Sequence, residues 1–181
     1  MVIDNEDLGL IEGFLKGNEE CFNKIVRKYQ EKVYYLALRI LGNHHDAEDV
    51  SSETFVRVYK HLKHLKEKQY FSTWLYRITL NLCYTKRKEN KYYEEISILN
   101  KISDSKATYH NFQIEEEDIK NKIKEVLKTL PKQQQTTFIL RVYEGFKFEE
   151  IAKIMGLSIG GVKSNYFKAV EKIKEGVKKF L

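Results

Sequence analysis

Residues 148–169 have the pattern of two helices that meet at a tight corner. In the first helix, Ile151 and Met155 lie four residues apart and so share one face. Gly156 stands where the chain must turn, because glycine adopts positive φ at no steric cost. Ser158 can cap the helix that follows, expected over residues 159–174. The apolar residues of that helix then recur at helical spacing: Val162, Tyr166, Ala169 and Ile173.

The second of these helices keeps polar and basic side chains on its outer side. They are Lys163, Ser164, Asn165 and Lys168, together with one aromatic residue, Phe167. A short helix, a glycine turn and a helix with such an outer side are typical of helix-turn-helix DNA readers. An ordinary helical hairpin is the alternative, and the rest of the chain decides between the two.

The other periodic segments of the chain are helical as well. Strand alternation and Asn-Gly or Asp-Gly hairpin signals are missing from the sequence, and Pro131 is its one proline. The remaining helices are expected at 6–15, 19–41, 46–65, 71–88, 119–130 and 132–143. Between them, the apolar periodicity fades from about residue 91 to 118, where polar residues dominate. The sequence therefore predicts an all-α protein of two small helical domains, 1–91 and 119–181, joined by a flexible linker, 92–118.

Charge and composition limit the class of protein. A formal net charge of +6 and a pI near 9.1 fit a nucleic-acid partner. Cys21 and Cys83 belong to no CxxC pair and are expected to be small core residues, which suits a reducing cytoplasm. No window approaches the roughly 18 uninterrupted apolar residues of a membrane span, and the first residues are acidic where a signal peptide would be basic. We expect a soluble, cytoplasmic protein with no membrane insertion of its own.

Acidic residues gather on one side of the helix expected at 46–65. Asp46, Asp49 and Glu53 are spaced i, i+3, i+7, and Glu48 lies beside them. Acids in a first helical turn are favoured by the helix dipole, so capping and a solvated face form one interpretation. The others are a metal or catalytic carboxylate cluster and a docking strip for a basic partner. A metal is disfavoured because ligands along one exposed helix side cannot close around an ion, and the isolated histidines complete no site. We expect no metal, no cofactor and no catalytic residue.

The helix expected from residue 71 carries a different mixture. Trp74, Arg77, Asn81, Tyr84 and Lys88 follow one another at helical spacing, which gives a face of aromatic, guanidinium, amide and ammonium groups. Such a face suits single-stranded or melted DNA, where bases stack on aromatic rings and basic groups hold phosphates. The alternative is that the two aromatic residues pack inside and the basic tail is only solvated.

Taken together, these segments resemble the bacterial extracytoplasmic-function (ECF) sigma factors of the sigma-70 superfamily. Residues 46–50 with Glu53 and Phe55 resemble the family's core-polymerase-binding helix. Residues 71–78, followed by Asn81-Leu82, resemble its promoter-melting and minus-ten-reading helix. Residues 130–131, 150–152 and 161–164 resemble its minus-thirty-five-reading domain. The match covers nearly the whole chain except the linker and the first few residues.

The resemblance implies a non-enzymatic transcription initiation factor that binds core RNA polymerase and promoter DNA, with an anti-sigma factor as a further partner. By the same resemblance, the polymerase-binding residues are Asp46, Glu48, Asp49, Glu53 and Phe55. The minus-ten residues are Tyr70, Trp74, Arg77, Asn81, Lys86 and Lys88. The minus-thirty-five residues are Gly160, Gly161, Lys163, Ser164, Asn165, Phe167 and Lys168.

The sequence also departs from the family pattern. Thr85 stands where an acid is common, Gly161 where threonine is common, and Asn165 and Lys168 where arginine is common. The missing arginine at 165 removes a fork that could grip phosphate or guanine bidentately, so the promoter sequence that is read can be unusual. Two rival functions remain at this point. One is a stand-alone helix-turn-helix regulator with an N-terminal sensor or dimerisation domain, and the other is a metal enzyme that uses the carboxylates of 46–53.

Overall fold

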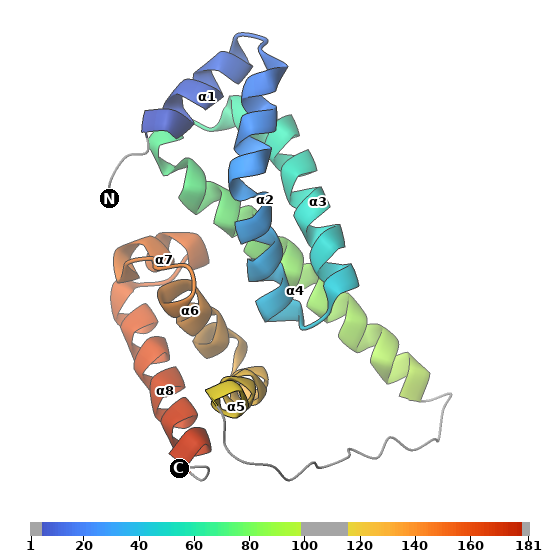
Figure 1. Cartoon of the computed structure of the whole chain (residues 1–181), viewed down its shortest axis with the longest axis vertical. Coiled ribbons are helices and arrows are strands. Elements are labelled where there is room, and N and C mark those ends of the chain that lie inside the picture. Colours follow the sequence, from blue (N-terminus) through green and yellow to red (C-terminus); the bar gives the residue numbers. More distant parts are fainter. Residues whose placement is uncertain (1–4, 99–115, 179–181) are drawn as a thin grey trace. The chain divides into compact units, whose positions relative to one another are not determined.

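The computed structural model describes residues 5–98 and 116–178, and every regular element within these two stretches is helical (Figure 1). The prediction of an all-α protein is confirmed for them. The chain divides into two compact units, the first built on α1, α2, α3 and α4 as far as Asn90, and the second mainly on α5 to α8. The helices are α1 (Asn5–Leu15), α2 (Glu19–Leu41), α3 (His44–His61), α4 (Phe71–Ile98), α5 (Glu116–Thr129), α6 (Lys132–Val142), α7 (Phe148–Met155) and α8 (Ile159–Lys178).

Local capping residues fix the ends of α2 and the start of α3. The Asn18 side chain accepts a hydrogen bond of 3.1 Å from the Glu20 backbone N–H, which satisfies one of the unpaired donors of the first turn of α2. Gly42 ends α2 in the left-handed conformation, with φ of 82°. The Asn43 side chain then caps α3 by accepting from the Asp46 backbone N–H at 2.8 Å. The α2 bounds match those expected from the sequence.

All four helices of the first unit contribute to its core. The apolar residues that recur at helical spacing along α2 are buried, although Val26 is only partly covered; the buried ones are Phe22, Ile25, Tyr29, Val33, Leu36 and Ile40. The buried cluster consists of Ile11, Phe22, Ile25, Tyr29, Val33, Phe55, Val58, Leu62, Phe71 and Leu75. This core fixes α3 and α4 and so determines which of their side chains reach the surface.

In the second unit, α8 packs against both α5 and α6. Leu127, Leu130, Ala169 and Ile173 form one buried cluster of this unit. The contact between α5 and α8 is close, because a Cβ added to Gly176 would lie 2.5 Å from Cγ2 of Val126. This packing holds α8 with one side open to solvent.

The predicted corner between α7 and α8 is confirmed. Gly156 has φ of 67° and its backbone N–H bonds the Ala152 carbonyl, so α7 ends in a left-handed glycine cap. The Ser158 hydroxyl accepts a hydrogen bond of 3.1 Å from the Gly161 N–H at the start of α8. The two helices of the motif are thereby fixed by the residues that the sequence singled out.

Several helix boundaries differ from the sequence prediction. The α-helical part of α3 ends at His61 and continues as a single 3-10 turn, Leu62–His64. The helix α4 runs to Ile98, and α5 begins at Glu116, so both extend into the span predicted as linker. Apolar periodicity reports the burial of one helix face, so by itself it does not mark the residue at which a helix begins or ends. The middle of the predicted linker, 99–115, lies outside the described residues.

Candidate nucleic-acid and protein interfaces

An acidic edge runs along the exposed side of α3. Glu48, Asp49 and Glu53 are all exposed there, as their spacing predicts. Two of them have neighbouring cations, because Asp49 accepts from Lys86 Nζ at 2.9 Å and Glu53 from Arg57 Nε at 2.8 Å. Their side chains remain 48% and 47% exposed. The edge therefore presents carboxylates that a basic partner can reach.

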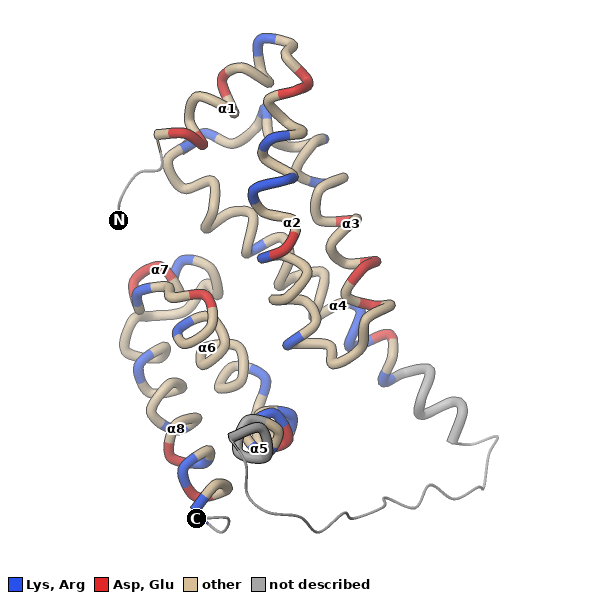
Figure 2. The backbone as a smooth tube through the Cα atoms, in the orientation of Figure 1, with Lys and Arg blue, Asp and Glu red and all other residues tan. Residues whose placement is uncertain are grey.

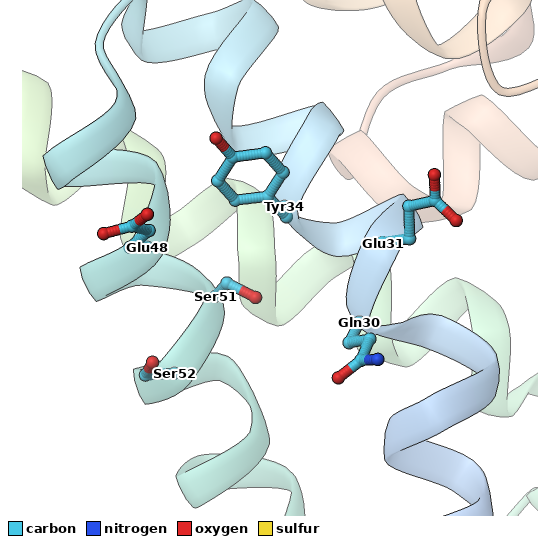
Figure 3. A pocket seen from close by; sticks show the side chains of 6 residues that line it. All are labelled: Gln30, Glu31, Tyr34, Glu48, Ser51 and Ser52. Atoms are coloured by element: carbon cyan, nitrogen blue, oxygen red, sulfur yellow. The ribbon is translucent and has the colours of Figure 1, made fainter.

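An open groove lies beside this edge, between α2 and α3 (Figure 3). Its volume is about 450 Å³. The hydroxyl of Tyr34 lies 2.6 Å from Nδ1 of His44, a hydrogen bond between α2 and the first residue of α3. Glu31 of α2 and Glu48 of α3 line the two sides of the groove, and in Figure 3 both carboxylates point outward, away from the ring of Tyr34. The full lining is Gln30, Glu31, Tyr34, Glu48, Ser51 and Ser52.

Two of the residues expected at the polymerase contact are not on the surface. Phe55 is 9% exposed and belongs to the core of the first unit. Asp46 is 8% exposed, because it lies on the inner side of the first turn of α3, next to the buried Ala47. In the folded unit, neither side chain is presented to a partner.

Asp46 instead joins α3 to α4. Its carboxylate accepts hydrogen bonds from the side chains of Asn43 at 2.5 Å and Asn90 at 2.6 Å, and Lys86 Nζ lies 3.4 Å away. Lys86 also bonds Asp49, so it bridges the two acids. We call the set Asp46, Asp49, Lys86 and Asn90 the α3–α4 clasp. Lys86, expected on a phosphate, thus lies against carboxylates in this structure.

The clasp changes the acidity of its members. Burial alone would raise the pKa of Asp46, but hydrogen bonds from Asn43, Asn90 and Lys86 together outweigh it and hold that pKa below its usual value. The hydrogen bond to Asp49 is the main cause that raises the pKa of Lys86. The charged forms of Asp46 and Lys86 are therefore both favoured, and ion pairs hold the clasp together at neutral pH.

Replacing Asp46 by asparagine tests the clasp. Because the folded pKa of Asp46 is lowered, its contribution to stability is present above the unfolded pKa of about 3.9 and is lost as the pH falls through the folded value. We expect Asp46→Asn to cost about 1–3 kcal/mol at pH 7, and the difference from the wild type to shrink below about pH 4. Urea unfolding followed by the fluorescence of Trp74, the only tryptophan, reports the first unit. A cost that stays constant down to the lowest pH would contradict the assignment.

The outer face of α4 holds three of the expected minus-ten residues. Arg77, Asn81 and Lys88 are exposed at successive helical positions. Trp74 is half-buried, because one side of its ring packs against the core, with its centroid 6.2 Å from that of Phe71. The structure thus brings guanidinium, amide and ammonium groups onto one face, with an indole at its edge. Tyr70 precedes this face and is also half-buried.

The outer side of α8 carries the most exposed large apolar residue of the described chain. The Phe167 side chain is 62% exposed, and Lys163, Ser164 and Lys168 are exposed around it. Tyr166 is half-buried and stacks on Phe138 at 6.3 Å, and its ring also meets that of Phe167 edge to face, with centroids 5.6 Å apart. These placements follow the prediction from the helical spacing.

Three further residues of α8 have a structural context that the sequence did not show. Asn165 is half-buried, and its amide donates to Gln133 Oε1 of α6 at 3.4 Å. A Cβ on Gly161 would lie 3.2 Å from the capping Ser158 oxygen, so this glycine fits the turn closely. A Cβ on Gly160 would meet no atom within 4 Å, so the backbone there is open to approach from outside.

No grouping of metal ligands is found in residues 5–98 and 116–178, and of the two free cysteines Cys83 is buried while Cys21 is half-buried. No three His, Cys, Asp or Glu side chains in these stretches are placed to hold a metal ion. Burial raises the pKa of Cys83 to about 12, so this thiol stays protonated at neutral pH. No helix of the same stretches combines the length and apolar composition that a bilayer crossing needs.

The sequence prediction assigned no site to α2, although this helix forms one wall of the groove. The signal was the pair Gln30 and Tyr34, which lie four residues apart on a side that the core does not use. Such a pair indicates one wall of a groove only when the position of the neighbouring helix is known. The groove could therefore not be assigned before α3 was placed beside α2.

Known proteins resemble this chain along most of its length. The family model of Sigma-70 region 2 matches residues 25–92, and that of Sigma-70, region 4 matches residues 120–173. The ECF RNA polymerase sigma-E factor of Escherichia coli is 31% identical, over 94% of each chain. The ECF RNA polymerase sigma factor SigW of Bacillus subtilis is 29% identical, over 88% of this chain and 90% of its own.

Two solved structures share the fold. One is the sigma factor RpoE in complex with the anti-sigma factor NepR from Bartonella quintana, with a TM-score of 0.69 at 22% identity over 87% of this chain and 96% of that chain. The other is CnrH in complex with the cytosolic domain of CnrY, with a TM-score of 0.72 at 20% identity over 96% and 98%. At these identities the likeness concerns the fold.

Proposed function

Because the chain belongs to the ECF class of RNA polymerase sigma factors, we propose that its first unit binds core polymerase and melted promoter DNA and that α8 binds the minus-thirty-five element. The observation that carries the proposal is the separation of three exposed faces of different chemistry. They are the acidic edge of α3, the Arg77–Asn81–Lys88 face of α4, and the Phe167 face of α8. Sigma factors are regulators, and we assign this chain no reaction of its own.

The acidic edge and the α2–α3 groove together form the proposed polymerase contact. Exposed ion pairs contribute little each, but a row of carboxylates sets the register and the association rate of a basic partner. Glu31 and Glu48, on the two sides of the groove, add carboxylates at its rim that a cationic side chain can reach. The chemistry therefore fits a polymerase surface that is basic and partly apolar.

The outer face of α4 is the proposed minus-ten contact. Arg77 and Lys88 are placed to bind phosphates, and Asn81 can pair with an exposed base. Trp74 and Tyr70 offer ring surface for stacking at the start of the helix. This combination suits a single strand, whose bases are free to leave the stack, better than an intact duplex.

The outer side of α8 is the proposed minus-thirty-five contact, made in the major groove. Phe167 fits a thymine methyl group or a sugar edge, and Lys163 and Lys168 fit the flanking phosphates. Ser164 lies between them, and the open backbone at Gly160 allows close approach to the DNA. The side chain of Asn165 is hydrogen-bonded to Gln133, so we expect it to lie at the edge of the major groove of the DNA and not to reach the base edges deep inside it.

An anti-sigma factor completes the proposed set of partners. One fold neighbour was solved with an anti-sigma factor and another with the cytosolic domain of a second protein. We accordingly place this chain in the cytoplasm, where polymerase and such a regulator meet it.

Run-off transcription tests the proposal. Purified chain and core polymerase are incubated with genomic fragments, including the DNA upstream of this protein's own gene. We expect discrete transcripts that need the chain and no other sigma factor. A stand-alone helix-turn-helix regulator would instead bind duplex DNA without core polymerase and support no transcription. That outcome, together with failure to copurify with core polymerase, would overturn the proposal.

A further inference from the structure

The outer side of α8 carries a carboxylate in line with the residues proposed to meet DNA. Gly160, Ser164, Phe167 and Glu171 follow one another at intervals of four, three and four residues, and all four are exposed. Residues so spaced share one side of a helix, and the buried residues of α8 lie on the opposite side. Figure 2 shows lysines along the length of α8 and acidic residues only in its second half. Glu171 is the first of these acids along the chain.

An open hollow on this side of α8 joins Glu171 to Phe167. Its volume is about 460 Å³. The lining residues that the structure describes all belong to α8: Ser164, Phe167, Lys168, Val170, Glu171 and Lys174. The ring and the carboxylate therefore border the same depression, and a base pair that meets one lies close to the other.

Within the described length of α8, Glu171 is not paired with the lysines beside it. Lys168 and Lys174 stand three residues before and after it, a spacing at which helical ion pairs form. Glu125 and Lys122 of α5 make such a pair, at 2.8 Å. In the stretches 5–98 and 116–178, by contrast, no hydrogen bond or ion pair reaches the carboxylate of Glu171. Its oxygens remain available to a donor from outside the chain.

The chemistry of the major groove limits what this carboxylate can bind. An ionised carboxylate only accepts hydrogen bonds, and the phosphates of DNA repel it. It gains energy in the groove only where a base offers a donor. Guanine and thymine present acceptors there, and adenine presents its N6 amine beside the N7 acceptor. Cytosine presents the N4 amine without such an acceptor, so it is the base that fits a carboxylate.

We propose that Glu171 reads a cytosine of the minus-thirty-five element by accepting a hydrogen bond from its N4 amine. The inference deepens the proposed function of α8 and rests on it. Glu171 follows Phe167 by about 6 Å along the helix, which corresponds to about two base pairs at about 3.4 Å each. The cytosine therefore lies one or two base pairs from the group that Phe167 contacts. Lys168 and Lys174 flank the carboxylate on either side and, on phosphates, offset its repulsion by the backbone.

The test measures base preference in the holoenzyme. Chain reconstituted with core polymerase selects from duplexes that carry a promoter found by run-off transcription, with its minus-thirty-five element randomised. We expect the wild type to favour cytosine about fivefold or more at one position. Glu171→Gln should move the preference at that position to adenine, because an amide can bind adenine N6 and N7 together. Glu171→Ala should leave no preference there, and Glu171→Asp should retain cytosine with weaker discrimination.

Glu175→Gln is the matched control. Glu175 is exposed one turn further along α8, so this change removes the same charge. It should strengthen binding to every duplex alike and leave each base preference unchanged. If Glu171→Gln does only the same, or if Glu171→Ala relaxes a preference for a base other than cytosine, the inference is overturned. If Phe167→Ala also leaves affinity and every base preference unchanged, the proposed minus-thirty-five contact fails with it.

Discussion

Replacing Asp49 and Glu53 by lysine is expected to abolish binding to core RNA polymerase while the chain stays folded. Both side chains are about half exposed on the acidic edge of α3, so reversing their charge sets like charges against a basic partner. Like charges at an interface cost several kcal/mol, and the affinity should fall by about 100-fold or more. The loss of the pairs with Lys86 and Arg57 should change the free energy of unfolding by no more than about 1 kcal/mol.

A control variant with two other charge reversals separates the effect of the acidic edge from the effect of net charge. Glu12→Lys with Glu67→Lys changes the charge of the same unit equally, at exposed positions away from α3. Copurification and a fluorescence titration with core polymerase measure both variants, and urea unfolding followed at Trp74 measures their stability. Wild-type binding by the Asp49 and Glu53 variant, or equal losses in the two variants, would contradict a specific contact at the edge.

Phe167→Ala is expected to weaken binding to duplex DNA that carries the minus-thirty-five element by about tenfold, equivalent to about 1.4 kcal/mol. The side chain is 62% exposed and its ring has an edge contact with Tyr166, so its removal gives up that contact but leaves no enclosed cavity in the second unit. We therefore expect its stability to change by less than about 0.5 kcal/mol. Gel-shift titration of the holoenzyme and thermal unfolding followed by circular dichroism measure the two quantities.

Val142→Ala is the control for this prediction. Val142 is 49% exposed on α6 and so removes a similar exposed apolar group from another helix of the same unit. It should change neither DNA binding nor stability. Lost stability with unchanged DNA affinity in Phe167→Ala would show that the ring packs against protein, and the DNA contact would have to be abandoned.

Features set by neighbouring residues could be predicted from the sequence. The end of α2 at Gly42 and the corner at Gly156 depend on glycine's access to positive φ, which is a local property. The exposure of Phe167 followed from its position opposite the apolar residues of α8. The burial of Phe55 could have been read in the same way, because it shares the apolar side of α3 with Val58. The family resemblance placed it at a partner surface instead.

Features that join distant residues could not be predicted. Asp46 and Asn90 are 44 residues apart in sequence, and only the packing of α4 against α3 brings them within 2.6 Å. Lys86 was therefore expected on a phosphate, since a lysine in a basic tail gives no sign of carboxylates in space. The groove between α2 and α3 has the same origin, because each helix contributes only one wall.

Replacing α4 by the corresponding helix of a relative, in order to change promoter choice, would separate the two halves of the α3–α4 clasp. A graft that brought a different residue to position 86 or 90 would leave the buried carboxylate of Asp46 short of partners, and the hybrid would lose stability before its promoter preference could be assayed. A hybrid must therefore keep Lys86 and Asn90 together with Asp46 and Asp49. The modular piece for building hybrids of this protein is the pair of helices, with α4 exchanged together with α3.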